Sequence, residues 1–347
     1  MKSKVKKIIL SLLSIVLIFA VGFSSYVLYR FNCNKLDNDS PISYEEIYTK
    51  ENINLNIAED GKFRVLKIND THFLNGVCEN DVKTLGGIKR VLDSTPCDLI
   101  IVNGDLVEGF NLSPEYDKLQ AIGNFTKLIQ SYNIPWTFAP GNNDCEIDGE
   151  NEDVITYLMG YSNFICGNSK DTDGSMQFFI DLYYQNKLAH SIAVMDSNSR
   201  KIRAIGGYDY IKESQINWLL GGVDSRNVKT SVFFHMPTPQ FKAAYENGEA
   251  YDNYRMYDNN NYAEIDENVL FDDAVSGNEN ITLLSCSHQH GNNMCSFYND
   301  RYYQLSSVSG YNAGRPAEII PSCTLTEIDV NSDDVKSMYT FNQIYFE

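Results

Sequence analysis

The chain has 347 residues, 43% of them hydrophobic, so it can bury a substantial core. Its formal net charge is −18, and residues 1–35 contain six basic side chains and no acidic one, so the remainder carries −24. A body this acidic is not expected to bind the phosphate backbone of nucleic acids. It also repels anionic substrates, so a phosphate group would need local positive charge, such as that of bound metal ions.

The first 35 residues have the pattern of a signal anchor. Four lysines precede residues 8–29, a stretch of 22 residues without a charged side chain. As a helix this stretch would span about 33 Å, close to a hydrocarbon core of about 30 Å. The basic side is expected to stay cytoplasmic, which predicts a single-pass membrane protein with an extracytoplasmic body. Ala20-Val21-Gly22 is also an acceptable cleavage site, so a secreted protein is the alternative.

Residues 36–60 are polar and acidic, which predicts a tether, and residues 61–347 are predicted to form one domain. The chain contains eight cysteines, and outside the cytoplasm these could pair. Cys145 and Cys286 lie beside two of the polar segments described below and could be neighbours. Unpaired packing is equally compatible with the sequence.

Strand and helix patterns alternate from residue 63 onwards. Apolar residues at helical spacing predict helices over residues 81–92, 119–129, 153–159 and 213–220. Apolar or alternating runs predict strands over residues 63–68, 99–102, 136–139, 178–184, 191–195, 232–234, 281–284, 295–298, 302–305, 323–328 and 338–346. Residues 185–187 and 299–300 predict hairpin turns. This α/β mixture predicts two packed sheets flanked by helices.

Five of the predicted strands end in residues that can bind metal ions. In chain order these residues are Asp70 and His72, Asp105, Asn142 and Asp144, His235, and His288 and His290. Four of the five histidines in the chain lie at these strand ends. Carboxylates and imidazoles together suit Zn, Mn or Fe. A hydrogen-bonded aspartate at a strand end would explain the first pair alone, whereas the full set favours a metal centre.

The order of these segments resembles the calcineurin-like metallophosphoesterase superfamily over about residues 63–290. The resemblance lies in Asp70-x-His72, Gly104-Asp105, Gly141-Asn142-x-Asp144, His235 and His288-x-His290. Residues 214–219, Gly310-Tyr311-Asn312 and Gly314-Arg315 further resemble the purple-acid-phosphatase-like, single-domain branch. The resemblance implies a four-layer αββα sandwich, in which two mixed β-sheets are flanked by helices.

The resemblance also implies two divalent or transition metal ions, of Mn, Fe or Zn. One ion would be held by Asp70, His72, Asp105 and His290. The other would be held by Asp105, Asn142, His235 and His288, so Asp105 would bridge the two. Such a pair of ions clamps a phosphoryl group and acidifies a water molecule into a nucleophile. The neutral Asn142 leaves the centre a net positive charge, and Asp144 is expected to orient a ligand.

One position departs from the family pattern. The family usually has Gly-Asn-His-Asp where this chain has Gly141-Asn142-Asn143-Asp144. The missing histidine normally contacts phosphate and can protonate the leaving oxygen, whereas the amide of Asn143 cannot donate a proton at neutral pH. General acid help is worth on the order of 10²–10⁴ in rate. Reduced or unusual activity is therefore expected, mainly on esters with poor leaving groups.

Three further features have two interpretations each. Arg315 could hold a phosphate oxygen or form a surface ion pair. The tyrosines between the fourth and fifth segments could stack on an aromatic substrate or lie in a mobile surface loop; they are Tyr245, Tyr251, Tyr254, Tyr257 and Tyr262. His190 lies away from every motif, which indicates a structural role rather than a ligand.

Taken together, these features predict an extracytoplasmic dinuclear phosphoesterase that hydrolyses small-molecule phosphate esters with a metal-activated water. The alternative is a catalytically weak or inactive surface protein that binds metal and phosphate ligands. The membrane is expected as a partner through residues 1–35.

Overall fold

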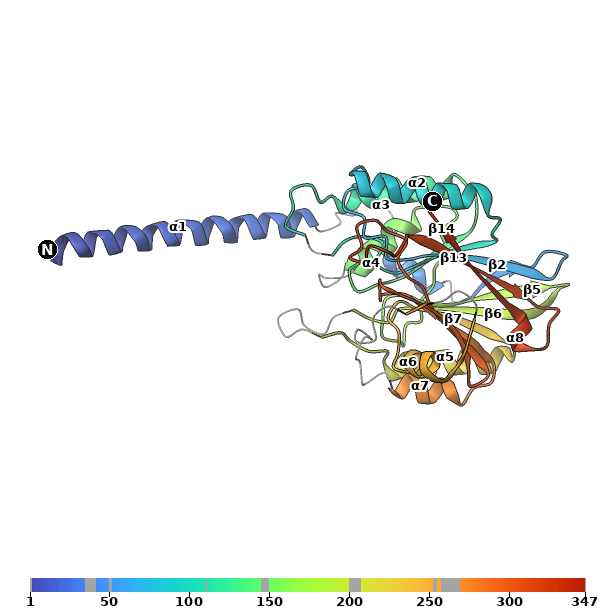
Figure 1. Ribbon diagram of the computed structural model, residues 1–347. Helices are drawn as coiled ribbons and strands as arrows, with labels where there is room; N and C mark the ends of the chain where they lie inside the picture. Colours follow the sequence, from blue (N-terminus) through green and yellow to red (C-terminus); the bar gives the residue numbers. More distant parts are fainter. Residues whose placement is uncertain are drawn as a thin grey trace.

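The computed structural model describes residues 2–34, 42–49, 52–109, 111–144, 150–199, 207–251, 255–256 and 269–346. Its body contains two mixed β-sheets, with helices covering their outer faces (Figure 1). Between the sheets lies a core of fully buried apolar side chains, among them Phe63, Ile101 and Phe178. The predicted fold class is confirmed.

The first sheet has five strands in the order β14-β13-β2-β3-β4. The strands β2 (Lys62–Ile68), β3 (Leu99–Asn103) and β4 (Trp136–Ala139) are parallel, while β13 (Ser322–Asp329) and β14 (Tyr339–Tyr345) are antiparallel additions. The helices α2 (Glu79–Ser94) and α3 (Lys118–Gln130) lie over this sheet in Figure 1. Two shorter helices follow strands of this sheet: α4 (Glu150–Met159) lies between β4 and β5 (Gln177–Tyr184) of the second sheet, and α8 (Val335–Met338) lies between β13 and β14.

The second sheet contains nine strands, with the path β1-β5-β6-β7-β10-β12-β11-β8 and β9 paired to β11. Its central strands are β5 (Gln177–Tyr184), β6 (Lys187–Met195), β7 (Thr230–Phe233), β10 (Ile281–Cys286), β12 (Arg301–Leu305) and β11 (Asn292–Tyr298). Its short edge strands are β1 (Asn52–Asn56), β8 (Glu249–Ala250) and β9 (Arg255–Met256). Its outer helices are α5 (Glu213–Arg226), α6 (Gln240–Asn247) and α7 (Val269–Ser276).

The predicted strand pairs 178–184 with 191–195 and 295–298 with 302–305 form hairpins, as β5–β6 and β11–β12. Each turn consists of two polar residues with positive φ. Gln185 and Asn186 have φ of 51° and 63°, and Asn299 and Asp300 have φ of 49° and 59°. Two consecutive left-handed residues give the type of turn that matches the twist of paired strands. The turn prediction at both positions is confirmed.

The segment before the domain differs from the predicted tether. Residues 44–49 form a 3₁₀ helix (Tyr44–Thr49), in which Ile47 is fully buried. β1 pairs in parallel with β5, so residues 52–56 belong to the second sheet. The polar composition of this segment favours a tether. Its apolar residues Ile53, Leu55 and Ile57 nevertheless alternate with polar residues, as in an edge strand with one buried face.

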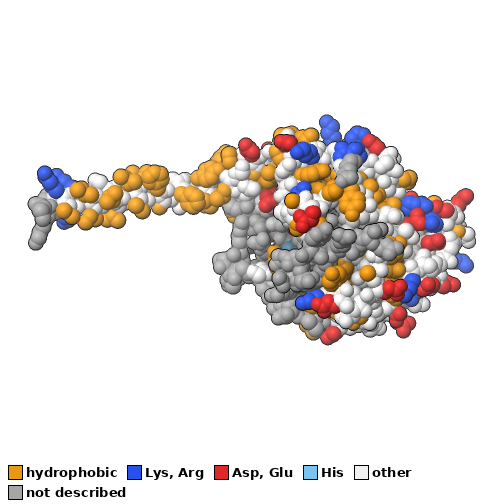
Figure 2. All heavy atoms as spheres, in the orientation of Figure 1, with side chains coloured by type: hydrophobic (Ala, Val, Ile, Leu, Met, Phe, Trp, Pro, Cys, Tyr) orange, Lys and Arg blue, Asp and Glu red, His pale blue; other side chains and the backbone are white. Residues whose placement is uncertain are grey.

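The helix α1 (Lys2–Asn34) projects from the body, with apolar side chains along most of its length (Figures 1 and 2). Within the described part of the chain, residues 4–33 form one helix long and apolar enough to cross a membrane. Seven described cysteines form no disulfide with one another, whereas Cys145 lies outside the described residues. The suggested proximity of Cys145 and Cys286 is therefore still a prediction.

Candidate metal centre

The five strand ends predicted to carry metal ligands meet at one place. β2, β3 and β4 are parallel within one sheet, and β6, β7 and β10 are parallel within the other. Parallel strands bring their carboxyl ends to the same edge of a sheet, where ligand sites gather. Here those edges carry two overlapping clusters of possible ligands. Each cluster has its ligand atoms within 4.8 Å of one another: Asp70, His72, Asp105 and His290 in one, and Asp105, His235 and His288 in the other.

Asp105 is the residue that the two clusters share. Its Oδ2 atom lies 3.6 Å from Nε2 of His72 and 3.3 Å from Nε2 of His235. On the other side, Asp70 Oδ1 lies 3.4 Å from Nε2 of His290 and 4.0 Å from Nε2 of His235. A carboxylate has two oxygens and can bridge two cations, so the central position of Asp105 suits a bridging ligand.

Several buried atoms of the centre make no hydrogen bond with the described residues. In the described residues, four such atoms make no hydrogen bond: Asp70 Oδ1, Asn142 Oδ1, His235 Nε2 and His288 Nδ1. A buried polar atom without a partner costs about 1–3 kcal/mol, and native proteins rarely tolerate several together. All four belong to predicted ligands, and oxygen and imidazole nitrogen are donors that Zn, Mn and Fe accept. The residues therefore fit a metal centre.

The backbone at these strand ends is turned sharply. Asp70, His72, Asp105 and His288 have φ between 47° and 72°, a left-handed region that few residues other than glycine adopt. Backbone hydrogen bonds hold two of these turns together, from Asp70 N to Gly104 O at 3.0 Å and from His72 N to Asp105 O at 3.1 Å. Such strain gathers at functional sites, where the surrounding structure must over-determine it.

Two glycines allow the closest approaches. A Cβ atom at Gly141 would lie 2.2 Å from the backbone nitrogen of Asp105 and 2.3 Å from its Oδ1 atom. Gly104 has φ of +84°, and a Cβ atom there would lie 2.2 Å from Nδ1 of His235. A side chain at either position would displace a predicted ligand, so both glycines belong to the structure of the centre.

Outer contacts orient the imidazoles of His235 and His290. Nδ1 of His235 lies 2.9 Å from the carbonyl oxygen of Asn103 and 3.0 Å from the hydroxyl of Ser287. Nδ1 of His290 lies 2.7 Å from the carbonyl oxygen of Gly314. In each case Nδ1 is occupied, which turns the Nε2 atom toward the carboxylates. Such partners fix the tautomer and orientation of ligand histidines.

Glu108 makes the corresponding contact to His72 and was missed by sequence reasoning. Its Oε2 atom lies 3.0 Å from Nδ1 of His72. It follows Asp105 by three residues, and nothing in that spacing marks it as a partner of His72, because the contact joins two different strand ends. Asn312, in the segment Gly310-Tyr311-Asn312, contacts the same strand end. Its amide donates to the carbonyl of His72 at 3.2 Å and also to the carboxylate of Asp81.

Burial and mutual charge set the protonation of the centre. Burial lowers the pKa of His235, but the carboxylates of Asp105 and Asp70 outweigh it and raise that pKa to about 10. Burial also lowers the pKa of His72, but the carboxylates of Glu108 and Asp105 outweigh this effect and raise that pKa to about 9. Burial would raise the pKa of Asp70 and Asp105, but the imidazoles hold both below the ordinary value. Metal ligands must be deprotonated, so a cation binding here would displace the imidazole protons.

The segment Gly141-Asn142-Asn143-Asp144 forms a compact loop around Asp105. Asn143 donates from its backbone nitrogen to Asp105 Oδ1 at 2.8 Å and from its amide to Asp105 Oδ2 at 2.7 Å. Asp144 is fully buried and accepts from the backbone nitrogens of Gly141 and Val107 at 2.9 and 3.2 Å. Burial, together with the charge of Asp105, raises the pKa of Asp144 to about 7. Asp144 thus holds the loop, and Asn143 holds the shared carboxylate.

The remaining predicted residues lie outside the clusters. Arg315 donates to the carbonyls of Ile319 and Tyr311 at 2.9 and 3.2 Å, within its own loop. Of the five tyrosines between the fourth and fifth motifs, Tyr254, Tyr257 and Tyr262 lie outside the described residues. The two described members lie on other structure: Tyr245 in α6, and Tyr251 packed at 5.3 Å against the ring of Phe341.

His190 is fully buried, away from the centre. Its Nε2 atom lies 2.9 Å from the hydroxyl of Ser231, and its ring packs edge-on against Tyr339 at 6.1 Å. Burial lowers its pKa to about 3, so the ring is neutral over the physiological range. These contacts agree with a structural role.

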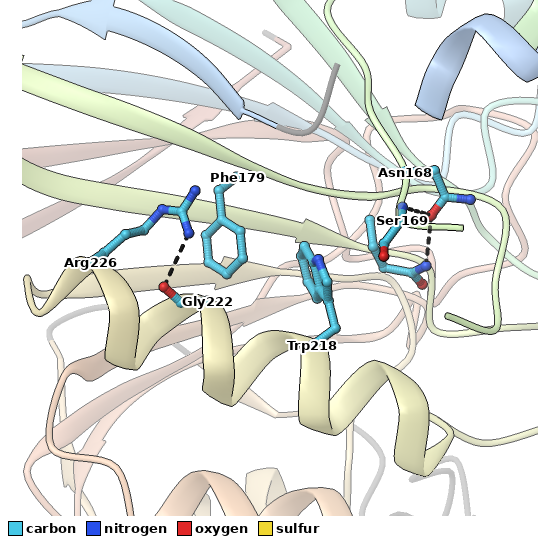
Figure 3. A pocket seen from close by; sticks show the side chains of 7 residues that line it. Asn168, Ser169, Phe179, Trp218, Gly222 and Arg226 are labelled. Atoms are coloured by element: carbon cyan, nitrogen blue, oxygen red, sulfur yellow. Dashed lines mark hydrogen bonds between the residues drawn. The ribbon is translucent and has the colours of Figure 1, made fainter. Parts of the chain in front are cut away.

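A separate pocket of about 210 Å³ opens between β5 and α5. Figure 3 shows the rings of Phe179 and Trp218 side by side, with Asn168 and Ser169 at one end and Arg226 at the other. Arg226 is engaged there, because its guanidinium contacts Asp181 Oδ1 at 2.6 Å and lies over the Phe179 ring. None of the predicted ligands lines this pocket, so it is distinct from the metal centre.

The chain matches a known protein family and is similar to several known proteins. The family model for calcineurin-like phosphoesterases matches residues 63–292, more than half of the chain. Probable inactive purple acid phosphatase 29 of Arabidopsis thaliana is 26% identical over 233 residues, covering 56% of this chain and 59% of that protein. Probable inactive purple acid phosphatase 28 of the same plant is 26% identical over 327 residues, covering 79% and 78%. Among solved structures, a dimetal phosphatase from Danio rerio aligns with a TM-score of 0.49 and 11% identity, covering 82% of this chain and 99% of that one.

Proposed function

Because the chain belongs to the calcineurin-like phosphoesterase family, we propose that it is a dinuclear metal-dependent phosphoesterase that hydrolyses phosphate esters. The observation that carries this proposal is the convergence of five strand ends on Asp105, with four buried ligand atoms that make no hydrogen bond among the described residues. One ion would be held by Asp70, His72, Asp105 and His290. The other would be held by Asp105, Asn142, His235 and His288.

The charge of the ligands explains how an acidic protein would hold a phosphate. Asp70 and Asp105 are the carboxylates among the seven proposed ligands, while the imidazoles and Asn142 are neutral when they bind metal. Two divalent ions would therefore outweigh the ligand charge and leave a local positive centre. When bound, such ions polarise the phosphoryl group and acidify a water molecule for attack on phosphorus.

The protein's own residues would position these parts. Asn143 fixes both oxygens of Asp105 by hydrogen bonds, and Asp144 holds the loop that carries Asn142 and Asn143. His235 and His290 are oriented by contacts at their Nδ1 atoms. Because Asn143 has no proton to donate at neutral pH, the leaving group would have to take its proton from water. Arg315 would approach a phosphate only by giving up its contacts to loop carbonyls.

A metal- and phosphate-binding protein without turnover is the second candidate. It is favoured by Asn143 at the position of the family's usual histidine, and by two plant relatives whose names describe them as probable inactive phosphatases. The two candidates share the metal centre and differ only in turnover. A loss of general acid help alone reduces the rate by on the order of 10²–10⁴, which slows an enzyme without abolishing the metal contribution.

We further propose that α1 is retained as a membrane anchor and that the body lies outside the cytoplasm. The lysines before residue 8 and the uncharged residues 8–29 support this orientation. A secreted form released by cleavage near Ala20-Val21-Gly22 is the alternative. Protease added to intact cells should degrade the body of the protein, and complete protection would contradict this location.

Turnover decides between the two functional candidates. The purified full chain, loaded separately with Mn, Fe or Zn, should be assayed on a panel of aryl and alkyl phosphomonoesters and diesters. Hydrolysis that is lost in Asp105→Ala supports the enzyme. Phosphate binding with two ions per chain and no hydrolysis of any ester would support the binding protein instead.

A further inference from the structure

The carboxyl end of α1 is held against the connection between β3 and α3. The Tyr26 hydroxyl donates to the carbonyl of Leu112, and the Arg30 guanidinium donates to the carbonyl of Tyr116 at 3.1 Å. Arg30 is 5% exposed, and Val27 and Phe31 on the same helical face are partly buried, whereas the described side chains before Val27 are exposed. The helix therefore has a defined docking face in its last turns.

The same connection reaches the metal centre. It begins directly after Asn103, at the carboxyl end of β3, and Asp105 is its second residue. The hydroxyl of Tyr116 donates to the carbonyl of Glu108 at 2.6 Å, and the carboxylate of Glu108 lies 3.0 Å from Nδ1 of His72. Contacts thus run without interruption from Arg30, through Tyr116 and Glu108, to a proposed metal ligand.

The docking face lies where the membrane would end. With residues 8–29 spanning the membrane, Tyr26 lies in the last turn of the span and Arg30 directly follows it, near the outer interface where aromatic and basic side chains are favoured. No linker separates the membrane segment from its contact with the body, because Arg30 directly follows the uncharged run. Along the chain, Asp105 is seven residues from Leu112, a span of at most about 25 Å.

The centre also lies on the side of the body that faces α1. β13 runs antiparallel to β2, so α8, which follows β13, marks the edge opposite the carboxyl end of β2. Figure 1 shows α1 leaving the body on the side away from α8. The strand ends that carry the proposed ligands therefore point toward the membrane side.

Electrostatics alone would not bring this body to a phosphate-rich surface. The chain beyond residue 35 carries −24, so an anionic lipid surface repels it. A covalent anchor overcomes this repulsion by replacing a bimolecular encounter with a high effective concentration. A docked anchor adds orientation, because it restricts which face of the body meets the lipid.

We propose that the substrate of the metal centre is a phosphate ester carried by a lipid of the same membrane, and that Tyr26 and Arg30 keep the centre turned toward it. This inference rests on the proposed phosphoesterase function and on a retained α1. A loosely tethered body would sample many orientations, so it would hydrolyse lipid-borne substrate more slowly than the docked body does.

The test uses the full metal-loaded chain reconstituted in phosphatidylcholine vesicles that contain phosphatidic acid. Its release of phosphate from the lipid is compared with its hydrolysis of water-soluble p-nitrophenyl phosphate. In the double variant Tyr26→Phe with Arg30→Gln, the lipid rate should fall by on the order of 10-fold while the soluble rate is unchanged. The matched control is Tyr29→Phe, which removes the hydroxyl of a side chain that is 62% exposed on the same helix.

A second readout needs no turnover. A photoreactive p-benzoylphenylalanine replaces either Glu115, in the docked connection, or Lys187, exposed at the start of β6 on the opposite edge. Lipid should crosslink to the first position and not to the second, and the double variant should lose this difference. Equal crosslinking at both positions would overturn the proposed orientation.

The outcomes separate this inference from the function on which it rests. Hydrolysis of the soluble ester without hydrolysis of the lipid keeps the phosphoesterase and overturns the lipid substrate. Equal lipid rates in the wild type and the double variant overturn the role of docking. Absence of turnover on both substrates, with two ions bound, overturns the phosphoesterase and the lipid substrate together.

Discussion

Asn143→His should restore a proton donor beside the proposed centre. In the wild type, water must protonate the leaving group, so aryl phosphates should be cleaved far better than alkyl phosphates. General acid help is worth on the order of 10²–10⁴ in rate, which corresponds to about 3–5 kcal/mol. The substitution should therefore raise turnover mainly on alkyl esters and narrow the difference between the two substrate classes.

The structure indicates that the rate gain from Asn143→His lies at the low end of the range for general acid help. The amide of Asn143 donates to Asp105 Oδ2 at 2.7 Å, a bond to a charged group worth about 1.5–3 kcal/mol that an imidazole must replace. The new ring also lacks a ready orienting partner, because both carboxylate oxygens of Asp144 accept backbone hydrogen bonds. A gain of about 10–100-fold on alkyl esters follows.

The assay compares kcat for paired aryl and alkyl monoesters at equal metal occupancy. Asn143→Gln is the matched control, since it keeps an amide and adds no acid. It should leave the ratio of aryl to alkyl rates near that of the wild type. The reasoning is refuted if the wild type shows no aryl preference and Asn143→His changes neither substrate class.

Three further predictions concern the centre and its support. Asp105→Ala should lose more bound metal than any other single substitution, because it removes the shared ligand; elemental analysis that finds full occupancy would refute the bridge. Gly141→Ala should weaken metal binding in a folded protein, since its Cβ would lie 2.2 Å from the backbone nitrogen of Asp105. It should also lower the free energy of unfolding in urea by about 1–3 kcal/mol. The control Gly221→Ala lies in α5 with no atom within 4 Å of the new Cβ, and it should raise the free energy of unfolding by about 0.5–1 kcal/mol. Burial holds the pKa of His190 at about 3, below the value of about 6.5 in an unfolded chain. The contribution of His190 to stability should therefore fall as pH drops from about 6.5 toward 3, by up to about 1.4 kcal/mol per pH unit. His190→Asn should flatten this dependence of unfolding free energy on pH, and an unchanged dependence would contradict the structural role of His190.

The strands that carry the proposed ligands were predictable because they are short, continuous apolar runs. Residues 99–102 and 281–284 are buried on both faces, as parallel strands between helices and a second sheet must be. The order of polar residues after those runs then placed Asp105 and His290 in one cluster. Periodicity and position along the chain were sufficient for this part of the structure.

Contacts between different loops were not predictable in the same way. Glu108 lies next to His72 only because two parallel strands bring their ends together, and its own neighbours carry no pattern. β1 was missed because it is a short edge strand in a polar segment, whose pairing with β5 depends on tertiary contact rather than on local propensity. The docking of Arg30 on Tyr116 likewise joins segments 86 residues apart.

Anomalous diffraction from crystals of the metal-loaded chain tests the central claim most directly. The account predicts two peaks at the ends of β2, β3, β4, β7 and β10, about 3.5–4 Å apart, with a carboxylate oxygen of Asp105 bound to each. One peak, or two that do not share Asp105, would contradict it.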